Sequence, residues 1–190
     1  ERDVQWTNGG VEGAWRFVHR VWTEFDSQPE GPVAVVDYRG HTEALDLLKA
    51  AHRLIGALTD SIEAFRFNGG IAKLYEFLNI LKGLPAASAT PEVLSARVDV
   101  LSILARLIAP FTPHLAEECW VRIGGSGMVV DAAWPVLDPE LAADDQRILP
   151  VQINGKRRGE VSAPAGLGHA EVEKLALADE TVARHLEGMT

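Results

Sequence analysis

The sequence contains a single cysteine and lacks both a long apolar run and a basic, apolar leader. Cys119 alone cannot form an internal disulfide or supply a zinc site with several thiolates. No apolar stretch approaches the roughly 20 residues that a membrane-spanning helix needs. Because no N-terminal signal segment is recognisable, we expect a cytoplasmic protein with no membrane partner.

Charge is present in moderate amount and is unevenly distributed. The 190 residues hold 18 Lys+Arg and 27 Asp+Glu, and 47% of them are hydrophobic, which excludes a disordered chain. Residues 1–150 carry 13 cations and 21 anions, a balance of −8, whereas residues 151–190 carry 5 and 6, a balance of −1. The acidity argues against nucleic-acid binding over the whole surface, and DNA is not an expected partner. A local basic patch remains available at the consecutive residues Lys156, Arg157 and Arg158.

Apolar residues recur every three or four positions in five segments of the first 125 residues. The pattern predicts helices at about 10–25, 42–64 and 69–82, a fourth from Pro91, and a short fifth that ends at Gly124. Proline at positions 110 and 113 predicts a break between the last two helices. Such helices, joined by short or moderate connections, favour an antiparallel bundle. Residues 126–147 are expected to be irregular, with Trp134-Pro135 holding them against the bundle.

Three polar residues are placed to cap these helices. Thr7 or Asn8 precedes the first helix, and Asn68 is predicted to cap the third. Thr90 precedes Pro91, a combination that is typical of a helix start.

Several residues that resemble ligands are interpreted as structural. Trp15 and Trp22 lie on the apolar stripe of the first helix and are predicted to be core residues. His52 lies at the edge of an apolar stripe and Cys119 has no histidine partner, so both are interpreted as structural. A zinc-protease helix needs two histidines four residues apart, and only one histidine accompanies the acids in the fifth helix. We therefore expect no metal site at His114, Glu117 and Glu118.

Charged residues on the first helix follow one another at intervals of four: Glu12, Arg16, Arg20 and Glu24. This spacing allows neighbouring charges to pair along a solvated face. The alternative is that Arg16 and Arg20 contact phosphate groups. The spacing alone leaves both interpretations open.

The last forty residues change from helical to strand-like periodicity. Asn154-Gly155 between two short apolar runs predicts a β-hairpin over about 148–162. A two-residue turn would place Val151 opposite Arg158. A three-residue loop with Gly155 in the left-handed conformation would instead place Leu149, Val151, Gly159 and Val161 on one face, which fits the apolar pattern better.

Helices are expected at about 169–178 and from Asp179 to about residue 187. A domain boundary is placed at residues 147/148, so that 1–147 form the bundle and 148–190 a small α+β unit. An isolated hairpin is marginal in water, which makes this unit incomplete. Because the chain also begins at Glu1 rather than at Met, we expect a part of a longer protein.

Five segments together resemble the C-terminal region of bacterial leucyl-tRNA synthetases. They are GVEGAWRFVHRVW (10–22), FRFN (65–68), IAPFTPHLAEECW (108–120), VQINGKRRGEV (151–161) and ALADETVARHLEG (176–188). The resemblance covers nearly the whole chain. The third segment is shared with isoleucyl and valyl relatives, whereas its combination with the last two is much more specific to the leucyl enzymes.

The resemblance implies a class I anticodon-binding bundle followed by part of the C-terminal domain. It implies a parent enzyme that attaches leucine to tRNA(Leu) using ATP with Mg²⁺, in catalytic and editing domains outside this chain. No phosphate-cradling loop, paired carboxylates or nucleophile–base pair appears, so no catalytic residue and no cofactor is expected here. The expected partners are tRNA(Leu) and the parent's other domains. The candidate tRNA contacts are Arg16, Arg20, Lys156, Arg157 and Arg158, with Asn154 and Gly155 forming the turn.

Two departures from the family pattern and two alternatives remain. Gly69-Gly70 replaces a larger residue after Asn68 and is expected to loosen that helix start. Arg157 replaces a residue that is often apolar and adds a third consecutive cation. One alternative is a helical protein-interaction module without RNA binding; the other is the same region of an isoleucyl or valyl enzyme.

Overall fold

The computed structural model describes residues 7–143, 146–164 and 167–187 of the chain. The chain divides into two compact units, residues 1–142 and 143–190, a few residues before the predicted boundary. Each unit is described by itself. Among the described residues, no helix combines the length and apolarity needed to cross a membrane.

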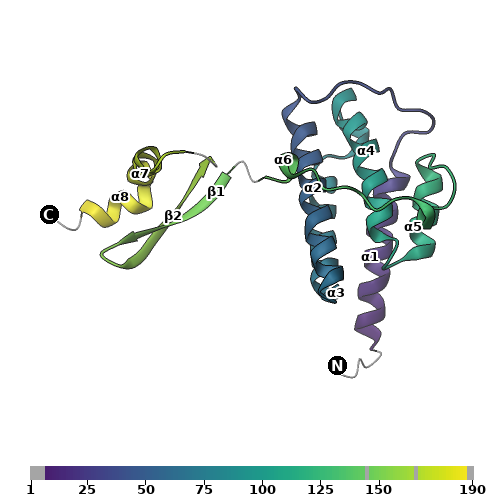
Figure 1. The fold of residues 1–190 in the computed structure, drawn as a ribbon, viewed down its shortest axis with the longest axis horizontal. Helices are drawn as coiled ribbons and strands as arrows, with labels where there is room; N and C mark the ends of the chain where they lie inside the picture. Colours follow the sequence, from purple (N-terminus) through teal and green to yellow (C-terminus); the bar gives the residue numbers. More distant parts are fainter. Residues whose placement is uncertain (1–6, 144–145, 165–166, 188–190) are drawn as a thin grey trace. The chain divides into compact units, whose positions relative to one another are not determined.

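The first unit is a bundle of five helices that lie side by side (Figure 1), which confirms the predicted mainly α fold. A 3₁₀ turn, η1 (Ala86–Ser88), precedes α4; a second, η2 (Val129–Asp131), and a short helix, α6 (Pro139–Ala142), follow α5. The five bundle helices are α1 (Asn8–Asp26), α2 (Thr42–Glu63), α3 (Phe67–Gly83), α4 (Pro91–Ile108) and α5 (Pro113–Arg122).

Helix α4 occupies the centre of this unit. It is in contact with α2 and α5, and residues on almost every side of it are buried. Thr90 Oγ1 accepts a hydrogen bond from the Val93 amide at 3.4 Å, which confirms the predicted cap. The helix ends at Ile108 and α5 begins at Pro113, which confirms the predicted break.

Helix α1 confirms its predicted start and corrects its predicted core face. Thr7 Oγ1 accepts a hydrogen bond from the Gly10 amide at 3.1 Å. The buried side chains are Phe17, Val21 and Phe25, four residues apart. Trp22 packs partly against the core, but Trp15 is 62% exposed, so its assignment to the core was wrong. The stripe that holds Trp15 is offset from the face that α1 turns toward α3.

Helix α3 begins earlier than predicted. It starts at Phe67, so Asn68 lies inside the first turn and does not cap it; Arg66 takes the cap position without a side-chain bond. Gly70 is buried, and a Cβ there would lie 3.0 Å from Leu58 Cδ2. The absence of a side chain therefore allows α3 to approach α2 closely.

The segment after α5 returns across the bundle, as predicted. Trp134 Nε1 donates a hydrogen bond to Thr59 Oγ1 at 3.0 Å, and Pro135 is buried. His52 Nδ1 accepts a hydrogen bond from the Asp138 amide at 3.1 Å. Burial lowers the pKa of His52, which keeps the imidazole in the neutral form that this bond requires. The structural role predicted for His52 is confirmed.

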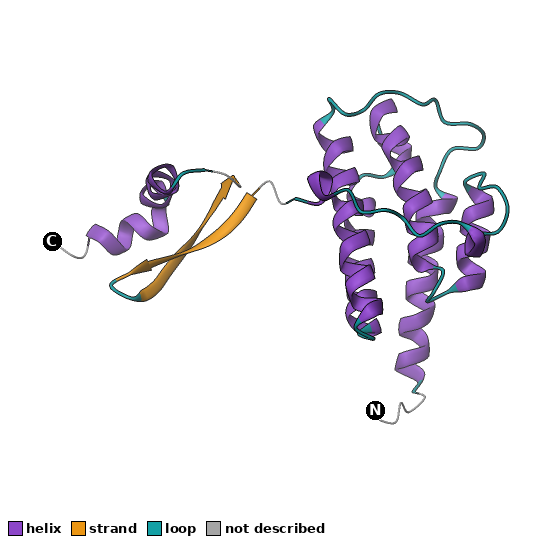
Figure 2. Ribbon diagram, viewed as in Figure 1, coloured by secondary structure: helices purple, strands orange, loops and turns teal. Residues whose placement is uncertain are grey.

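The second unit consists of a hairpin and two helices (Figure 2). Strand β1 (Gln146–Ile153) pairs antiparallel with β2 (Lys156–Pro164), and both extend slightly beyond the predicted 148–162. Helices α7 (His169–Ala178) and α8 (Glu180–Glu187) contact β2. Val161, Ala163 and Val182 are buried between these elements.

The hairpin register combines features of the two predicted alternatives. The turn has two residues, Asn154 and Gly155, as in the first alternative. A bulge then shifts the register, so that Val151 lies opposite Gly159 and Arg158 has no partner in the ladder. This pairing produces the apolar face of the second alternative, because the bulge adds the one residue by which the two registers differ.

Candidate nucleic-acid interface

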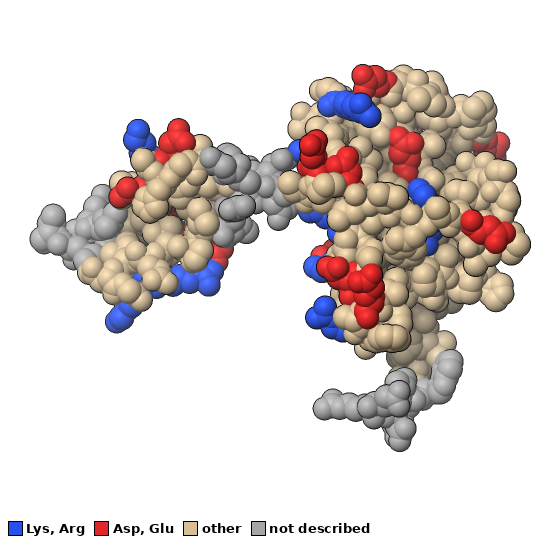
Figure 3. All heavy atoms as spheres, in the orientation of Figure 1, with Lys and Arg blue, Asp and Glu red and all other residues tan. Residues whose placement is uncertain are grey.

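The hairpin turn places three cations next to one another at one end of the second unit. Asn154 and Gly155 both have positive φ, 51° and 75°, as a tight two-residue hairpin turn requires. Lys156, Arg157 and Arg158 follow directly and are all exposed. Figure 3 shows Lys and Arg side chains gathered over the hairpin. Because the three side chains are exposed, they keep their charge in contact with solvent and lose little hydration.

The three cations differ in their surroundings. Arg157 forms an ion pair with Glu160, and both side chains are about half exposed. Within the described part of the chain, neither Lys156 nor Arg158 forms an ion pair. Arg158 is the extra residue of the bulge, and bulges change the direction in which a strand and its side chains point. Two of the three cations are thus available to an anionic partner without first losing a carboxylate.

Close packing on the hairpin's apolar face supports this arrangement. A Cβ at Gly159 would lie 3.0 Å from Val182 Cγ2, so α8 rests directly on the strand backbone. The packed residues Gly159, Val161 and Ala163 follow the cations directly along β2. The turn is therefore positioned by a small core rather than by the charged residues themselves.

The two candidate arginines on α1 are in unequal environments. Arg16 is exposed and lies 3.8 Å from the Glu12 carboxylate, a geometry that is worth little in water. Arg20 Nη2 donates a hydrogen bond to Asn79 Oδ1 at 2.5 Å, and its guanidinium lies 5.3 Å from the Tyr75 ring centroid. Arg20 therefore helps to join α1 to α3, and Arg16 is the more available of the two.

Glu24 does not take part in the predicted ladder of charges along α1. Its carboxylate pairs with Arg97 Nη2 at 2.9 Å, and the Arg97 side chain is completely buried. Arg97 Nη1 also donates to the backbone oxygens of Leu81 and Leu84 at 3.1 and 2.7 Å. Arg97 thus satisfies carbonyl groups at the end of α3 and ties them to α1. Arg97 is not among the residues predicted from the sequence, although a cation inside an apolar helix is a visible signal.

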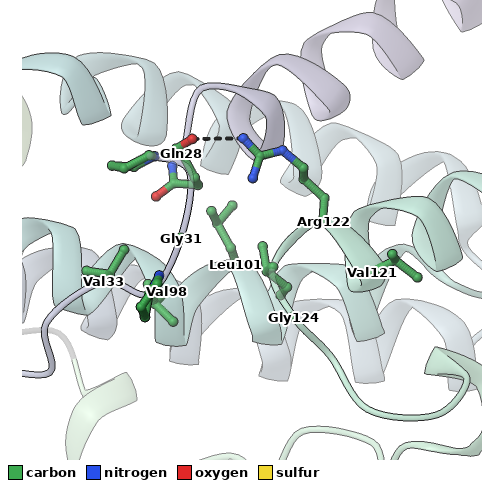
Figure 4. Close-up of a pocket in the computed structure, with 11 residues that line it drawn as sticks. Gln28, Gly31, Val33, Val98, Leu101, Val121, Arg122 and Gly124 are labelled. Atoms are coloured by element: carbon green, nitrogen blue, oxygen red, sulfur yellow. Dashed lines mark hydrogen bonds between the residues drawn. The ribbon is translucent and has the colours of Figure 1, made fainter.

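A pocket of about 460 Å³ lies where the loop after α1 meets α4 and α5 (Figure 4). Its lining is largely apolar, and Arg122 stands at its edge. Arg122 Nη2 donates hydrogen bonds to the backbone oxygens of Asp26 and Gln28 at 3.0 and 2.9 Å. These bonds, with an ion pair to Asp26 at 3.8 Å, hold the Arg122 guanidinium against the loop after α1.

Other residues whose side chains could react or bind a metal have structural roles. Cys119 is fully buried, and burial raises the pKa of its thiol to about 12, so it is an unreactive core residue as predicted. The Glu117 carboxylate accepts hydrogen bonds from the Val129 and Val130 amides at 2.9 and 3.3 Å. Among the described residues, no three His, Cys, Asp or Glu side chains come together as metal ligands would.

The chain thus combines a bundle of helices with a small unit that carries an exposed basic hairpin turn. The family described as the anticodon-binding domain of tRNA ligases matches residues 45–174, which reach into both units. The chain belongs to this family.

The chain is also similar to leucine–tRNA ligases. The chain is 66% identical to that of Caulobacter vibrioides and 53% identical to that of Phenylobacterium zucineum, in both cases over 100% of its own length. It spans about a fifth of these relatives, 22% of each. A solved structure, the ternary complex of Agrobacterium radiobacter K84 agnB2 LeuRS with tRNA and LeuAMS, matches 96% of the chain and 23% of its own, with a TM-score of 0.72 and 27% identity.

Proposed function

We propose that this chain is the tRNA-binding, C-terminal part of a cytoplasmic leucine–tRNA ligase and that its RNA partner is tRNA(Leu). The observation that carries the proposal is the exposed cationic turn, in a chain whose relatives are leucine–tRNA ligases along its whole length. The relative in the solved ternary complex is bound to tRNA.

The cations would contact the phosphate backbone rather than the bases. Lys156 and Arg158 supply charge that no carboxylate of the described chain neutralises, and Arg157 would exchange Glu160 for phosphate. Phosphate contacts fix the register of a protein on RNA but carry no sequence information. The turn would therefore position the tRNA and leave its identity to be read elsewhere.

Arg16 is the stronger candidate for a second contact, on the bundle. It is exposed, whereas Arg20 would have to leave Asn79 and Tyr75 to reach a phosphate. Arg20 would then act mainly by fixing α1 against α3. This division of roles refines the expectation that both arginines bind RNA.

The chemical step would take place outside this chain. ATP with Mg²⁺, leucine and the editing activity would belong to the other four fifths of the ligase, and this segment would be non-catalytic. In support, the Cys119 thiol is buried, and the carboxylates described beside the exposed cations, Glu12 and Glu160, are paired with Arg16 and Arg157.

The test is a titration of the 190-residue chain with tRNA at low salt. We expect binding that weakens steeply as salt rises, and the Arg158→Ala variant should bind more weakly. Lys174→Ala is the matched control, because it removes an exposed cation from α7 in the same unit. Equal losses in both variants would indicate non-specific attraction. No binding to tRNA at any salt concentration would favour a protein-interaction module.

A further inference from the structure

The turn between α2 and α3 holds a bulky residue in a conformation that favours glycine. Phe65 has φ of 54°, and the amides of Phe65 and Arg66 donate to the backbone oxygens of Ile62 and Ser61 at 3.0 and 2.7 Å. This pair of hydrogen bonds is the common way to end a helix with one left-handed residue, which is usually glycine. A phenylalanine there is strained, because its Cβ crowds the following carbonyl.

Packing of the Phe65 side chain against the described residues does not compensate for this strain. The Phe65 side chain is 81% exposed, and its ring meets the edge of Phe67 at a centroid distance of 6.1 Å. Phe67 is itself 45% exposed and lies edge-on to Phe111 at 6.2 Å. A strained backbone that projects an aromatic ring into solvent is a reason to look for a binding partner.

The same end of the bundle exposes further apolar surface. Helix α1 begins at this end and runs parallel to α3, as the contacts of Tyr75 with Gly13 and of Arg20 with Asn79 require (Figure 1). The first half of α1 exposes Val11 and Trp15, which no helix of the bundle covers. Exposed apolar side chains thus occur on two elements at this end of the bundle, and exposed apolar surface of this kind marks an interaction site.

The chemistry of this end favours a protein partner. Arg66 is the single cation of the turn Phe65–Phe67, and the residues that project beside it are aromatic. An RNA backbone would require more positive charge than this. The relatives extend far beyond the chain, which spans 22% of their length, so a large protein surface is available in the same polypeptide.

We propose that Phe65 and Phe67 dock into an apolar recess on the part of the ligase that precedes this chain. Phe65 is held out by the left-handed turn as a preformed anchor. This inference rests on membership in the tRNA-ligase family, and it is independent of RNA binding by the hairpin turn.

The experiment compares Phe65→Gly in the 190-residue chain and in the full-length ligase. Glycine relieves the strain, so the melting temperature of the chain should rise by about 2–4 °C. In the full-length ligase the lost anchor should outweigh this gain, so that the melting temperature falls and the amides of residues 65–70 exchange faster. Opposite signs in the two contexts are the expected result.

Two variants keep the test decisive. Phe65→Asn retains a residue that tolerates the left-handed conformation and should reproduce the loss in the ligase. Val35→Ala, at a side chain that is 93% exposed in a loop, should act alike in both contexts. An equal rise in both contexts for Phe65→Gly would overturn the proposal. If the melting temperature rises in both the chain and the ligase and tRNA binding weakens, the proposal is also overturned and RNA is the partner. Failure of the hairpin proposal would instead appear only in the variants of Lys156, Arg157 and Arg158.

Discussion

The two units of this chain differ in the size of their buried cores. The bundle has a continuous core to which α1 to α5 all contribute, and it also holds a fully buried Arg97 with its partners. In the second unit, the apolar side chains described as buried are Val161, Ala163 and Val182. The stability of the first unit can therefore come from its own core, whereas the second unit has only a small core.

The difference shows where each unit can place its functional groups. In the bundle, the guanidinium groups of Arg20, Arg97 and Arg122 are all engaged by carbonyl or amide oxygens. In the second unit, Lys156 and Arg158 form no such bonds with the described residues. A thin core leaves more of the chain at the surface, where charge remains available to a partner.

The largest effect should come from the buried cation of the bundle. Arg97→Met leaves the Glu24 carboxylate, which is 12% exposed, without its partner and deprives Leu81 and Leu84 of a donor. We expect a loss of about 3–5 kcal/mol in the free energy of unfolding of the bundle. Urea unfolding followed by circular dichroism of the helices measures it.

The control is the exposed ion pair of α1. Arg16→Ala removes a contact of 3.8 Å between two exposed side chains and should cost less than about 1 kcal/mol. Similar losses for Arg97→Met and Arg16→Ala would contradict the central role given to Arg97.

A smaller effect should appear in the second unit alone. Gly159→Ala would place the new Cβ only 3.0 Å from Val182 Cγ2, which is closer than two methyl groups normally pack. Overpacking of this kind costs about 1–3 kcal/mol. Amide exchange should therefore accelerate in β2 and α8, while the amides of α4 keep their protection.

A second substitution sharpens this prediction. Val182→Ala removes the methyl group that the new Cβ of Gly159→Ala would meet, so the double variant should recover part of the loss. If the two losses simply add, the contact between the hairpin and α8 does not position the turn. Faster exchange in α4 would show that the two units are not independent.

Periodicity and turn chemistry were sufficient to predict most of the fold. The helix starts at Thr7 and Thr90 and the break between Ile108 and Pro113 follow from local rules, and local rules are visible in a sequence. The turn at Asn154-Gly155 was predicted for the same reason. The sequence also indicated the exposed cations, although their binding to tRNA stays a prediction.

The errors arose where distant contacts decide the outcome. Trp15 lies on a regular apolar stripe, but the bundle turns the face of Phe17 inward and leaves Trp15 at the surface. Arg97 is paired across a long stretch of sequence with Glu24, which no local pattern reveals. The cap at Asn68 is a wrong prediction that rests on the preference of asparagine for helix caps; α3 starts one residue before Asn68, after a turn in which Phe65 takes the left-handed position that glycine usually holds.

The most direct measurement is the KM for tRNA of the full-length ligase in which Lys156, Arg157 and Arg158 are all changed to alanine. If the hairpin turn holds the RNA backbone, KM for tRNA rises while KM for leucine is unchanged. The slope of log affinity against log salt should also fall by about 2–3, one phosphate contact for each cation. The same KM for tRNA as the unmodified enzyme at every salt concentration would contradict the account.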